Sequence, residues 1–376
     1  MGRGIRFLCV SASAFALLAN ASSASAAGGI QHIAGLGTAI PISTKAPAWF
    51  TPALYRKVVR AGVHGVPLSS IRTSGKRGKG SGAAAGGGCL SSAGTGPTTS
   101  TMGPTGAVER PPVGIGPGTW LISLFCTNVG GQPVPDGFAW CTANFVFQSS
   151  SSFGLGTAGH CAAKDALASP VTAVVQPPPE VCAAGGSCAP GLYAIGTFKV
   201  AHNNGLGDDF ALISLYPQFN SWVRPTMPVF GGPTGPYFGG LPTVTPPTLA
   251  LGPATVLTPS YSPALLGQCG HGLVVGTGGT CRTQAGLFSS GSWYAWYGPS
   301  FEGDSGSGVE ILGNPSASNA VPAAADLTHI IISDLTVHNG KVTEGPDQPG
   351  MVGGTQMSKI LQIVGTSWKL VPGAVP

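Results

Sequence analysis

Three short stretches of this sequence carry residue types that together could perform nucleophilic catalysis. Ser305 lies in EGDSGSGV, His160 in GLGTAGHCAA and Asp209 in GLGDDFALISL. A serine hydroxyl is a poor nucleophile near neutral pH, so it needs a base to take its proton and a carboxylate to hold that base in one tautomer. In this set we expect Ser305 to attack a carbonyl, His160 to transfer the proton and Asp209 to orient the imidazole.

The order of these residues along the chain excludes one class of serine hydrolase. α/β-Hydrolases run in the order serine, acid, histidine and place the serine in Gly-x-Ser-x-Gly. In this chain the histidine comes first, and Ser307 stands where that motif requires its second glycine. Taken singly, each stretch is as well explained by a structural histidine or a turn residue. The functional interpretation therefore depends on the three occurring together.

Together the three stretches resemble the motifs of chymotrypsin-type (trypsin-like) serine proteases. That family's Thr-Ala-x-His-Cys is matched by residues 157–161, its aspartate before an apolar-Ala-apolar strand by residues 209–212, and its Gly-Asp-Ser-Gly by residues 303–306. The separations of 49 and 96 residues between the three candidates are close to those usual in the family. Asp208 is the competing carboxylate, but it is one residue out of register with the apolar run.

The resemblance covers residues 112–376 and implies a fold and an activity. The expected fold is all-β, with two antiparallel six-stranded β-barrels and the active site in the cleft between them. The expected activity is that of a serine endopeptidase acting through an acyl-enzyme. Two alternatives stay open: a catalytically inactive secreted binding protein on the same fold, and a serine esterase, since ester and peptide hydrolysis share this chemistry.

The same resemblance assigns roles to the residues around the serine. The backbone N–H groups of Gly303 and Ser305 are expected to form the oxyanion hole. Asp304 resembles a buried aspartate whose ion pair fixes the oxyanion loop. No Arg-Ile-Val-Gly-Gly activation sequence occurs in the chain, so Arg282 or Arg224 is the expected partner.

The substrate pocket is not expected to select basic residues, although Asp334 or His338 could give it a charge. The family's selectors for basic residues place an acidic residue six positions before the serine, where this chain has Pro299, followed by Ser300. Cleavage after Lys or Arg is therefore disfavoured. Residues 329–340, HIIISDLTVHNG, are expected to supply the strand that binds the substrate backbone, with Ser333 near the pocket. Three further polar residues are expected in solvent: Glu302, Asp334 and His338.

Composition and the first residues favour export. Residues 1–26 have a basic start, an apolar middle and small residues at the end, which is typical of a cleaved signal peptide. We therefore expect a secreted protein, extracellular or periplasmic, with no membrane anchor. Only 8% of the residues are charged and the net charge is +5 without a dense basic patch in the last two thirds, which argues against nucleic-acid binding.

The amino-acid composition divides the chain into a leader and a β-rich domain. Residues 27–111 are expected to be a pro-segment or leader with a Gly/Ser/Pro-rich linker, in which TPALYRKVVRAG is a short helix capped by Thr51 and GKRGKG is a candidate processing site of a zymogen. Residues 112–376 carry short β-type runs between turn residues. The expected strands are GTWLISLFC, FAWCTANFVF, AIGTFKVA, DFALISLY, SGVEILG, HIIISDLTVHNG and KILQIVG.

Eight cysteines remain after the signal peptide, an even number that favours disulfides in an exported chain. The resemblance implies Cys141–Cys161 beside the histidine. Short loops favour Cys182–Cys188 and Cys269–Cys281, and Cys89–Cys126 is the remaining pair. The histidines show no metal-ligand spacing, so we expect no metal and no cofactor. The expected partners are protein or peptide substrates, and the expected state is a monomer.

Overall fold

The computed structural model describes most of the chain after residue 30. The described residues are 31–33, 37–42, 46, 49–71, 106–108, 112–129, 132–162, 167–182, 189–241, 264–270, 279–298, 300–301, 303–312, 321–332, 337–338, 341–342 and 350–375. The predicted signal peptide and most of the predicted linker, including GKRGKG, lie outside them. No helix among the described residues combines the length and hydrophobicity needed to cross a lipid bilayer.

The first sheet is a nine-stranded antiparallel sheet built mainly from the first half of the β-rich domain. Its order is β21 (Lys369–Leu370), β7 (Val146–Gln148), β8 (Phe153–Thr157), β11 (Asp209–Leu215), β10 (Gly191–Asn203), β9 (Pro170–Val175), β5 (Trp120–Val129) and β6 (Gln132–Thr142), and β3 (Val66–Pro67) pairs with β10. The predicted run FAWCTANFVF forms the end of β6 and the start of β7 rather than one strand.

The second sheet is a ten-stranded antiparallel sheet built mainly from the second half. Its order is β1 (Gln31–Ile33), β2 (Gly37–Pro41), β17 (His329–Ile332), β20 (Gly350–Thr355), β14 (Trp293–Gly298), β13 (Gly279–Ser290), β12 (Leu265–Gly270), β15 (Gly308–Leu312) and β16 (Ala323–Asp326), and β4 (Gly106–Val108) pairs with β13. A short hairpin joins β18 (Val337–His338) to β19 (Lys341–Val342).

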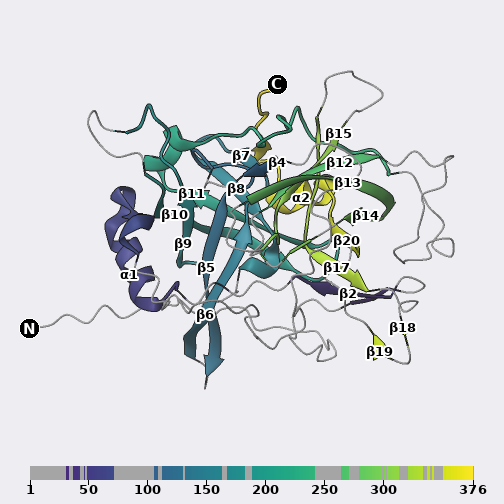
Figure 1. The fold of residues 1–376 in the computed structure, drawn as a ribbon, viewed down its shortest axis with the longest axis horizontal. Helices are drawn as coiled ribbons and strands as arrows, with labels where there is room; N and C mark the ends of the chain where they lie inside the picture. The colour runs from purple at the N-terminus through teal and green to yellow at the C-terminus, as the bar shows by residue number, and fades with distance from the viewer. Residues whose placement is uncertain are drawn as a thin grey trace, which may run out of the picture.

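The strand pairing confirms the predicted fold class. The described part of the chain is dominated by these two antiparallel sheets, which lie side by side in Figure 1. Each sheet has more strands than the six expected for a barrel. Part of the excess comes from the N-terminal segment, which adds β3 to the first sheet and β1, β2 and β4 to the second, and from the C-terminus, which adds β21 to the first.

Strand β11 shows why apolar runs without polar alternation form strands here. Its even-numbered residues Phe210 and Leu212 pack in one buried cluster, while Ala211 and Ile213 pack in another. Successive side chains of a strand point to opposite faces, so a strand covered on both faces must be apolar throughout. Asp209 opens this strand and is held at a fixed position by it.

The segment before residue 72 is part of the folded body. Helix α1 (Pro52–Ala61) begins at the predicted cap, where Thr51 Oγ1 accepts a hydrogen bond from the Leu54 N–H at 3.2 Å. Its Tyr55 and Val58 are buried in a cluster with Trp140 and other residues of the first sheet. Figure 1 shows α1 along the outer side of that sheet, beside β9 and β10.

One predicted strand is wrong. KILQIVG forms most of helix α2 (Met357–Val364), which ends at Gly365. Its buried residues Met357, Ile360 and Val364 follow a spacing of three and four, which is the period of a helix with one buried face and not of a strand.

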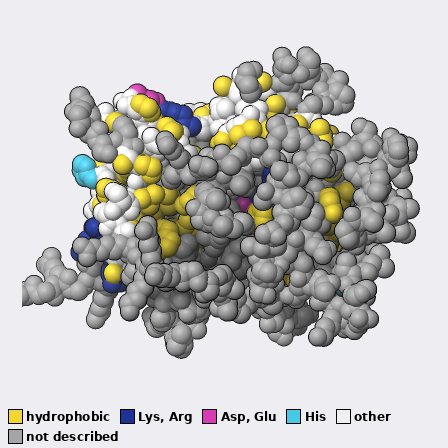
Figure 2. Space-filling model, viewed as in Figure 1, with side chains coloured by type: hydrophobic (Ala, Val, Ile, Leu, Met, Phe, Trp, Pro, Cys, Tyr) yellow, Lys and Arg dark blue, Asp and Glu magenta, His cyan; other side chains and the backbone are white. Residues whose placement is uncertain are grey.

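Among the described residues on one face of the molecule, charged side chains are few. On the face shown in Figure 2, hydrophobic side chains dominate the coloured area and charged side chains are scattered among them.

Candidate active site

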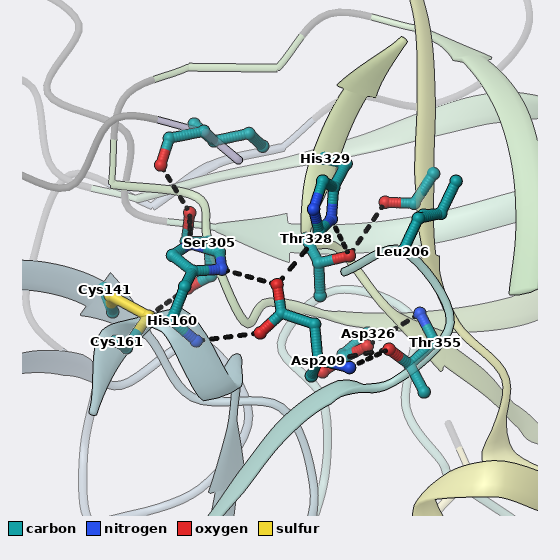
Figure 3. A network of polar contacts seen from close by, with 12 residues as sticks. Cys141, His160, Cys161, Leu206, Asp209, Ser305, Asp326, Thr328, His329 and Thr355 are labelled. Atoms are coloured by element: carbon teal, nitrogen blue, oxygen red, sulfur yellow. Dashed lines mark hydrogen bonds and ion pairs between the residues drawn. A yellow bond between two sulfur atoms is a disulfide. The ribbon is translucent and has the colours of Figure 1, made fainter. Parts of the chain in front are cut away.

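The structure brings together the three residues predicted to perform the chemistry. His160 lies in the short 3-10 turn η3 (Gly159–Cys161), Asp209 opens β11, and Ser305 lies between β14 and β15 of the second sheet. The Nδ1 atom of His160 is 2.7 Å from Asp209 Oδ2, and its Nε2 atom is 2.8 Å from Ser305 Oγ. Figure 3 shows the three side chains in line. Serine, imidazole and carboxylate therefore form one hydrogen-bonded chain between the two sheets.

Asp209 is fully buried, and its surroundings keep it ionised. Burial raises the pKa of a carboxyl group, but the charge interaction with His160, two hydrogen bonds from the same residue and the nearby His329 outweigh it, so the pKa of Asp209 lies below its ordinary value. The ionised carboxylate accepts a hydrogen bond from Nδ1–H, and Nδ1 keeps its proton. Nε2 of His160 is then the acceptor nitrogen, facing the hydroxyl of Ser305.

A disulfide fixes the turn that carries His160. Cys141 of β6 and Cys161 are joined by an S–S bond across 20 residues, and the carbonyl of Cys161 accepts a hydrogen bond from Ser123 Oγ at 2.5 Å. This is the pairing that the resemblance implied. The histidine is thus anchored to β5 and β6 on the side opposite its carboxylate.

The loop before Ser305 is held by a buried ion pair. Arg282 of β13 pairs with Asp304, and both side chains are almost inaccessible to solvent. Asp304 Oδ2 also accepts the N–H of Phe301 at 2.9 Å, and the Arg282 guanidinium lies over the Phe301 ring at 5.0 Å. Of the two expected partners of Asp304, the structure selects Arg282, since Arg224 pairs with Glu180 near the surface.

The backbone of this loop orients the N–H of Ser305. The Asp304 carbonyl accepts the N–H of Ser307 at 2.9 Å, and because the peptide bond is trans, the N–H of Ser305 points away from that turn. Gly303 has a φ of 95°, which favours glycine, and its carbonyl accepts Thr142 Oγ1–H at 2.8 Å. The loop is therefore pinned to β6 in the geometry that exposes a backbone donor beside the nucleophile.

Gly306 is required by a close approach between the two sheets. Its φ is 86°, and a Cβ atom there would lie 2.2 Å from Thr157 Oγ1 and 2.5 Å from the Ala158 nitrogen. Only glycine allows the serine loop to contact the strand that leads to His160.

Sequence reasoning missed a second histidine at the carboxylate. His329, the first residue of β17, is fully buried, and its Nδ1 lies 3.6 Å from Asp209 Oδ2 and 2.8 Å from Thr328 Oγ1. Thr355 of β20 anchors the backbone of Asp209. Its hydroxyl accepts a hydrogen bond from the Asp209 N–H and donates one to the Asp209 carbonyl, both at 3.2 Å. Neither His329 nor Thr355 belongs to a recognisable motif, and each is identified only by its position on a strand beside the site.

A backbone group of the N-terminal segment also lies at the nucleophile. The carbonyl oxygen of Ile42, the residue after β2, is 3.3 Å from Ser305 Oγ. No role was expected for Ile42; its only signal in the sequence is the short apolar run TAIPI ahead of the predicted helix.

The structure describes only some of the other residues predicted to belong to the site. Ser300 is buried, with 5% of its surface exposed. Asp208 does not contact His160 but bonds to His202 and Asn204 and pairs with Lys359. The residues Cys89, Cys188, Pro299, Glu302, Ser333 and Asp334 lie outside the described residues, and of His338 the structure describes only the backbone in β18.

The disulfide pattern agrees with the predictions where it can be followed. Cys269 and Cys281 are joined across β12 and β13. Cys182 is disulfide-bonded, and its predicted partner lies outside the described residues, as does the predicted partner of Cys126. No group of three or more His, Cys, Asp or Glu side chains in the described part of the chain is arranged to hold a metal ion.

Comparisons with known proteins find similar solved structures. No protein-family model and no curated protein matches the chain. Protease A of Thermobifida fusca matches at 15% identity and a TM-score of 0.33, covering 69% of this chain and 98% of its own. A glutamic acid specific serine protease matches at 12% identity and a TM-score of 0.36, covering 69% and 100%. Human heparin binding protein matches at 12% identity and a TM-score of 0.35, covering 65% and 88%. We therefore base the function on the site geometry and not on these scores.

Proposed function

We propose that this protein is a secreted serine endopeptidase that hydrolyses peptide bonds through an acyl-enzyme. The observation that carries this proposal is the unbroken chain from Asp209 through His160 to Ser305, with contacts of 2.7 and 2.8 Å among buried groups. These distances are those required for proton transfer between a nucleophile and its base.

The proposed reaction has two halves, acylation and deacylation, and the same three residues act in both. Ser305 Oγ attacks the substrate carbonyl carbon while its proton passes to His160 Nε2, and the imidazolium then protonates the leaving amine. Water enters, gives a proton to His160 and attacks the ester, and His160 returns that proton to Ser305 Oγ as the acid product leaves. Asp209 keeps the ring in the correct tautomer and stabilises its positive charge. The carboxylate does not itself take the proton.

The proposed oxyanion hole consists of the N–H groups of Gly303 and Ser305. The orientation of the Ser305 N–H, the positive φ of Gly303 and the Arg282–Asp304 ion pair support it. Preorganised donors of this kind are each worth about 10²-fold or more in rate, because they do not reorganise as the oxyanion forms.

We also propose that the protein acts outside the cytoplasm on proteins or peptides. The signal-like residues 1–26 and the two disulfides Cys141–Cys161 and Cys269–Cys281 support export. The absence of an acidic residue six positions before Ser305, where the chain has Pro299, supports a preference other than Lys or Arg before the cleaved bond. Ser300 is the described residue proposed to line that pocket.

The experiment that tests the proposal combines covalent labelling with proteolysis. Purified exported protein is treated with a fluorophosphonate probe and, separately, given casein, with Ser305→Ala and His160→Ala as controls. We expect labelling and casein cleavage by the wild type alone. A folded wild type that neither labels nor cleaves would overturn the proposal in favour of a binding protein, and labelling with hydrolysis of esters but not casein would favour an esterase.

A further inference from the structure

The N-terminal strand β2 occupies the strand position at which an extended peptide would bind beside the nucleophile. It pairs antiparallel with β17 in the register His329↔Pro41, Ile330↔Ile40 and Ile331↔Ala39. Strand β17 lies within residues 329–340, which are expected to bind the substrate backbone. Addition of a peptide strand to a sheet edge uses main-chain hydrogen bonds for affinity and side-chain pockets for selectivity.

The next residue places a peptide group at the reacting atoms. The Ile42 N–H donates to the Thr328 carbonyl at 3.3 Å, and the Ile42 carbonyl oxygen lies 3.3 Å from Ser305 Oγ. The hydroxyl has one proton and a nearer acceptor, His160 Nε2 at 2.8 Å. The hydroxyl proton is thus directed to the base, and the Ile42 carbonyl group, the group that Ser305 would attack, lies beside Oγ.

The Ile42 side chain fills an apolar site. Only 1% of its surface is exposed, and it belongs to a buried cluster that includes Leu241, Tyr294, Trp296 and Val352. Burial of this kind stabilises an aliphatic side chain, whereas a charged side chain would be strongly destabilised there.

The chain then reaches the other sheet. The N–H of Ala46 donates to the Phe138 carbonyl of β6 at 2.9 Å, so the segment is bound to the second sheet before Ile42 and to the first sheet after it. The described residues on either side, Ile42 and Ala46, are therefore bound to different sheets, with the Ile42 carbonyl at the nucleophile.

We propose that the Ile42–Ser43 peptide bond is the first substrate of this enzyme, cut within its own chain by Ser305, and that Ile42 defines the preferred residue before the cleaved bond. This inference rests on the proposed function. It also implies that the sequence Ala39-Ile40-Pro41-Ile42 fits the site, with Ile42 in the pocket that selects the residue before the cleaved bond.

The cut balances as an ordinary hydrolysis. Ser305 Oγ bonds to the carbonyl carbon of Ile42, the C–N bond to Ser43 breaks, and His160 passes the serine proton to the released amine. Water then cleaves the ester, leaving a carboxylate on Ile42, an amino group on Ser43 and the hydroxyl of Ser305 restored. No other reactant is required.

The cut leaves the body of the enzyme intact. Helix α1 and β3 follow Ser43 and stay packed through Tyr55, Val58 and Val66, which are buried in the first sheet. Strands β1 and β2 become a separate chain held by β17 alone in the sheet. Their departure opens the strand position to other peptides.

The test follows the N-terminus of the exported protein over time. Full-length wild type and Ser305→Ala are purified in parallel, and intact mass and N-terminal sequencing report cleavage, with fluorophosphonate labelling of the wild type as an independent measure of the nucleophile. We expect a new N-terminus at Ser43 in the wild type and none in Ser305→Ala. A wild type that labels and digests casein while the Ile42–Ser43 bond stays whole overturns the inference and leaves the proposed function standing. The same cut in Ser305→Ala would also overturn it, because another protease would be responsible.

Two variants and a peptide pair test the role of Ile42. Ile42→Asp should slow the cut at least about 100-fold and Ile42→Val should retain it, while Val63→Asp, at an exposed position of η1 (Gly62–His64), serves as the matched control. The processed enzyme should cleave Ala-Ile-Pro-Ile substrates with a kcat/KM at least about 10-fold above Ala-Ile-Pro-Lys. This comparison does not depend on folding of any variant, and equal rates for the two peptides would overturn the assigned preference.

Discussion

His160 holds Asp209 with two hydrogen bonds, one from its ring and one from its backbone. The ring Nδ1 lies 2.7 Å from Oδ2, and the backbone N–H donates to Oδ1 at 2.8 Å. Both carboxylate oxygens are therefore committed to the same residue, which fixes the plane of the carboxylate relative to the imidazole. A neutral amide at this position could accept from only one of the two donors.

Asp209→Asn should therefore reduce kcat by about 10³- to 10⁴-fold, because the amide would present an N–H to the ring and stabilise the wrong tautomer. Steady-state kinetics on a peptide substrate measure this effect. Asp208→Asn is the matched control, because Asp208 bonds to His202 near the surface and not to His160. A comparable loss in both variants would contradict the assignment of Asp209.

The predictable part of the site was the part encoded in local motifs. Residues 157–161 and 303–306 each form a short turn whose geometry depends on neighbouring residues, so their sequence alone indicated their role. His329 and Ile42 reach the site because β17 pairs with β2, which is far away in the sequence, and no local pattern encodes that pairing. The wrong prediction for helix α2 has a different cause: the window KILQIVG omits Met357, so the helical spacing of Met357, Ile360 and Val364 was not visible in it.

Arg282→Met should destabilise the fold and reduce activity. Removing one partner leaves the buried Asp304 carboxylate uncompensated, at a cost of about 3 to 5 kcal/mol, and frees the loop that aims the Ser305 N–H. Urea unfolding measures the loss. The exposed pair offers the control: Arg224→Met, opposite Glu180, should cost at most about 1 kcal/mol. Equal costs in the two variants would show that the buried pair is not a structural anchor.

Gly306→Ala should abolish activity even where the protein folds. The added methyl group would overlap Thr157 Oγ1 and the Ala158 nitrogen, so the serine loop and the turn carrying His160 must move apart. Gly291→Ala is the control, since that residue also has a positive φ, of 57°, but no atom within 4 Å of the added methyl group. Retained catalysis in Gly306→Ala, measured as kcat with casein-derived peptides, would contradict this packing.

Glu310→Gln should stabilise the protein increasingly as the pH rises. Glu310 of β15 is fully buried, and burial raises its pKa well above the ordinary value, so the folded protein keeps a proton that the unfolded chain releases above about pH 4. The unfolded state then binds fewer protons than the folded state, and the stability of the wild type falls as the pH rises toward the folded pKa.

The amide removes this penalty, which grows by up to about 1.4 kcal/mol per pH unit in that window. Denaturant unfolding at pH 4 and pH 8 should therefore show a gain for Glu310→Gln that is small at the lower pH and large at the higher one. The exposed Glu180→Gln serves as the control. A gain independent of pH would mean that Glu310 is ionised in the folded protein.

The most direct test of the central claim is to locate the covalent adduct formed by a fluorophosphonate. The exported protein is labelled, digested and examined by mass spectrometry, with Ser305→Ala and Asp209→Asn treated in parallel. We predict a single adduct on Ser305 of the wild type, strongly slowed labelling of Asp209→Asn and no adduct in Ser305→Ala. Unmodified Ser305 in a folded and processed wild type would contradict the claim that Asp209, His160 and Ser305 form a working catalytic triad.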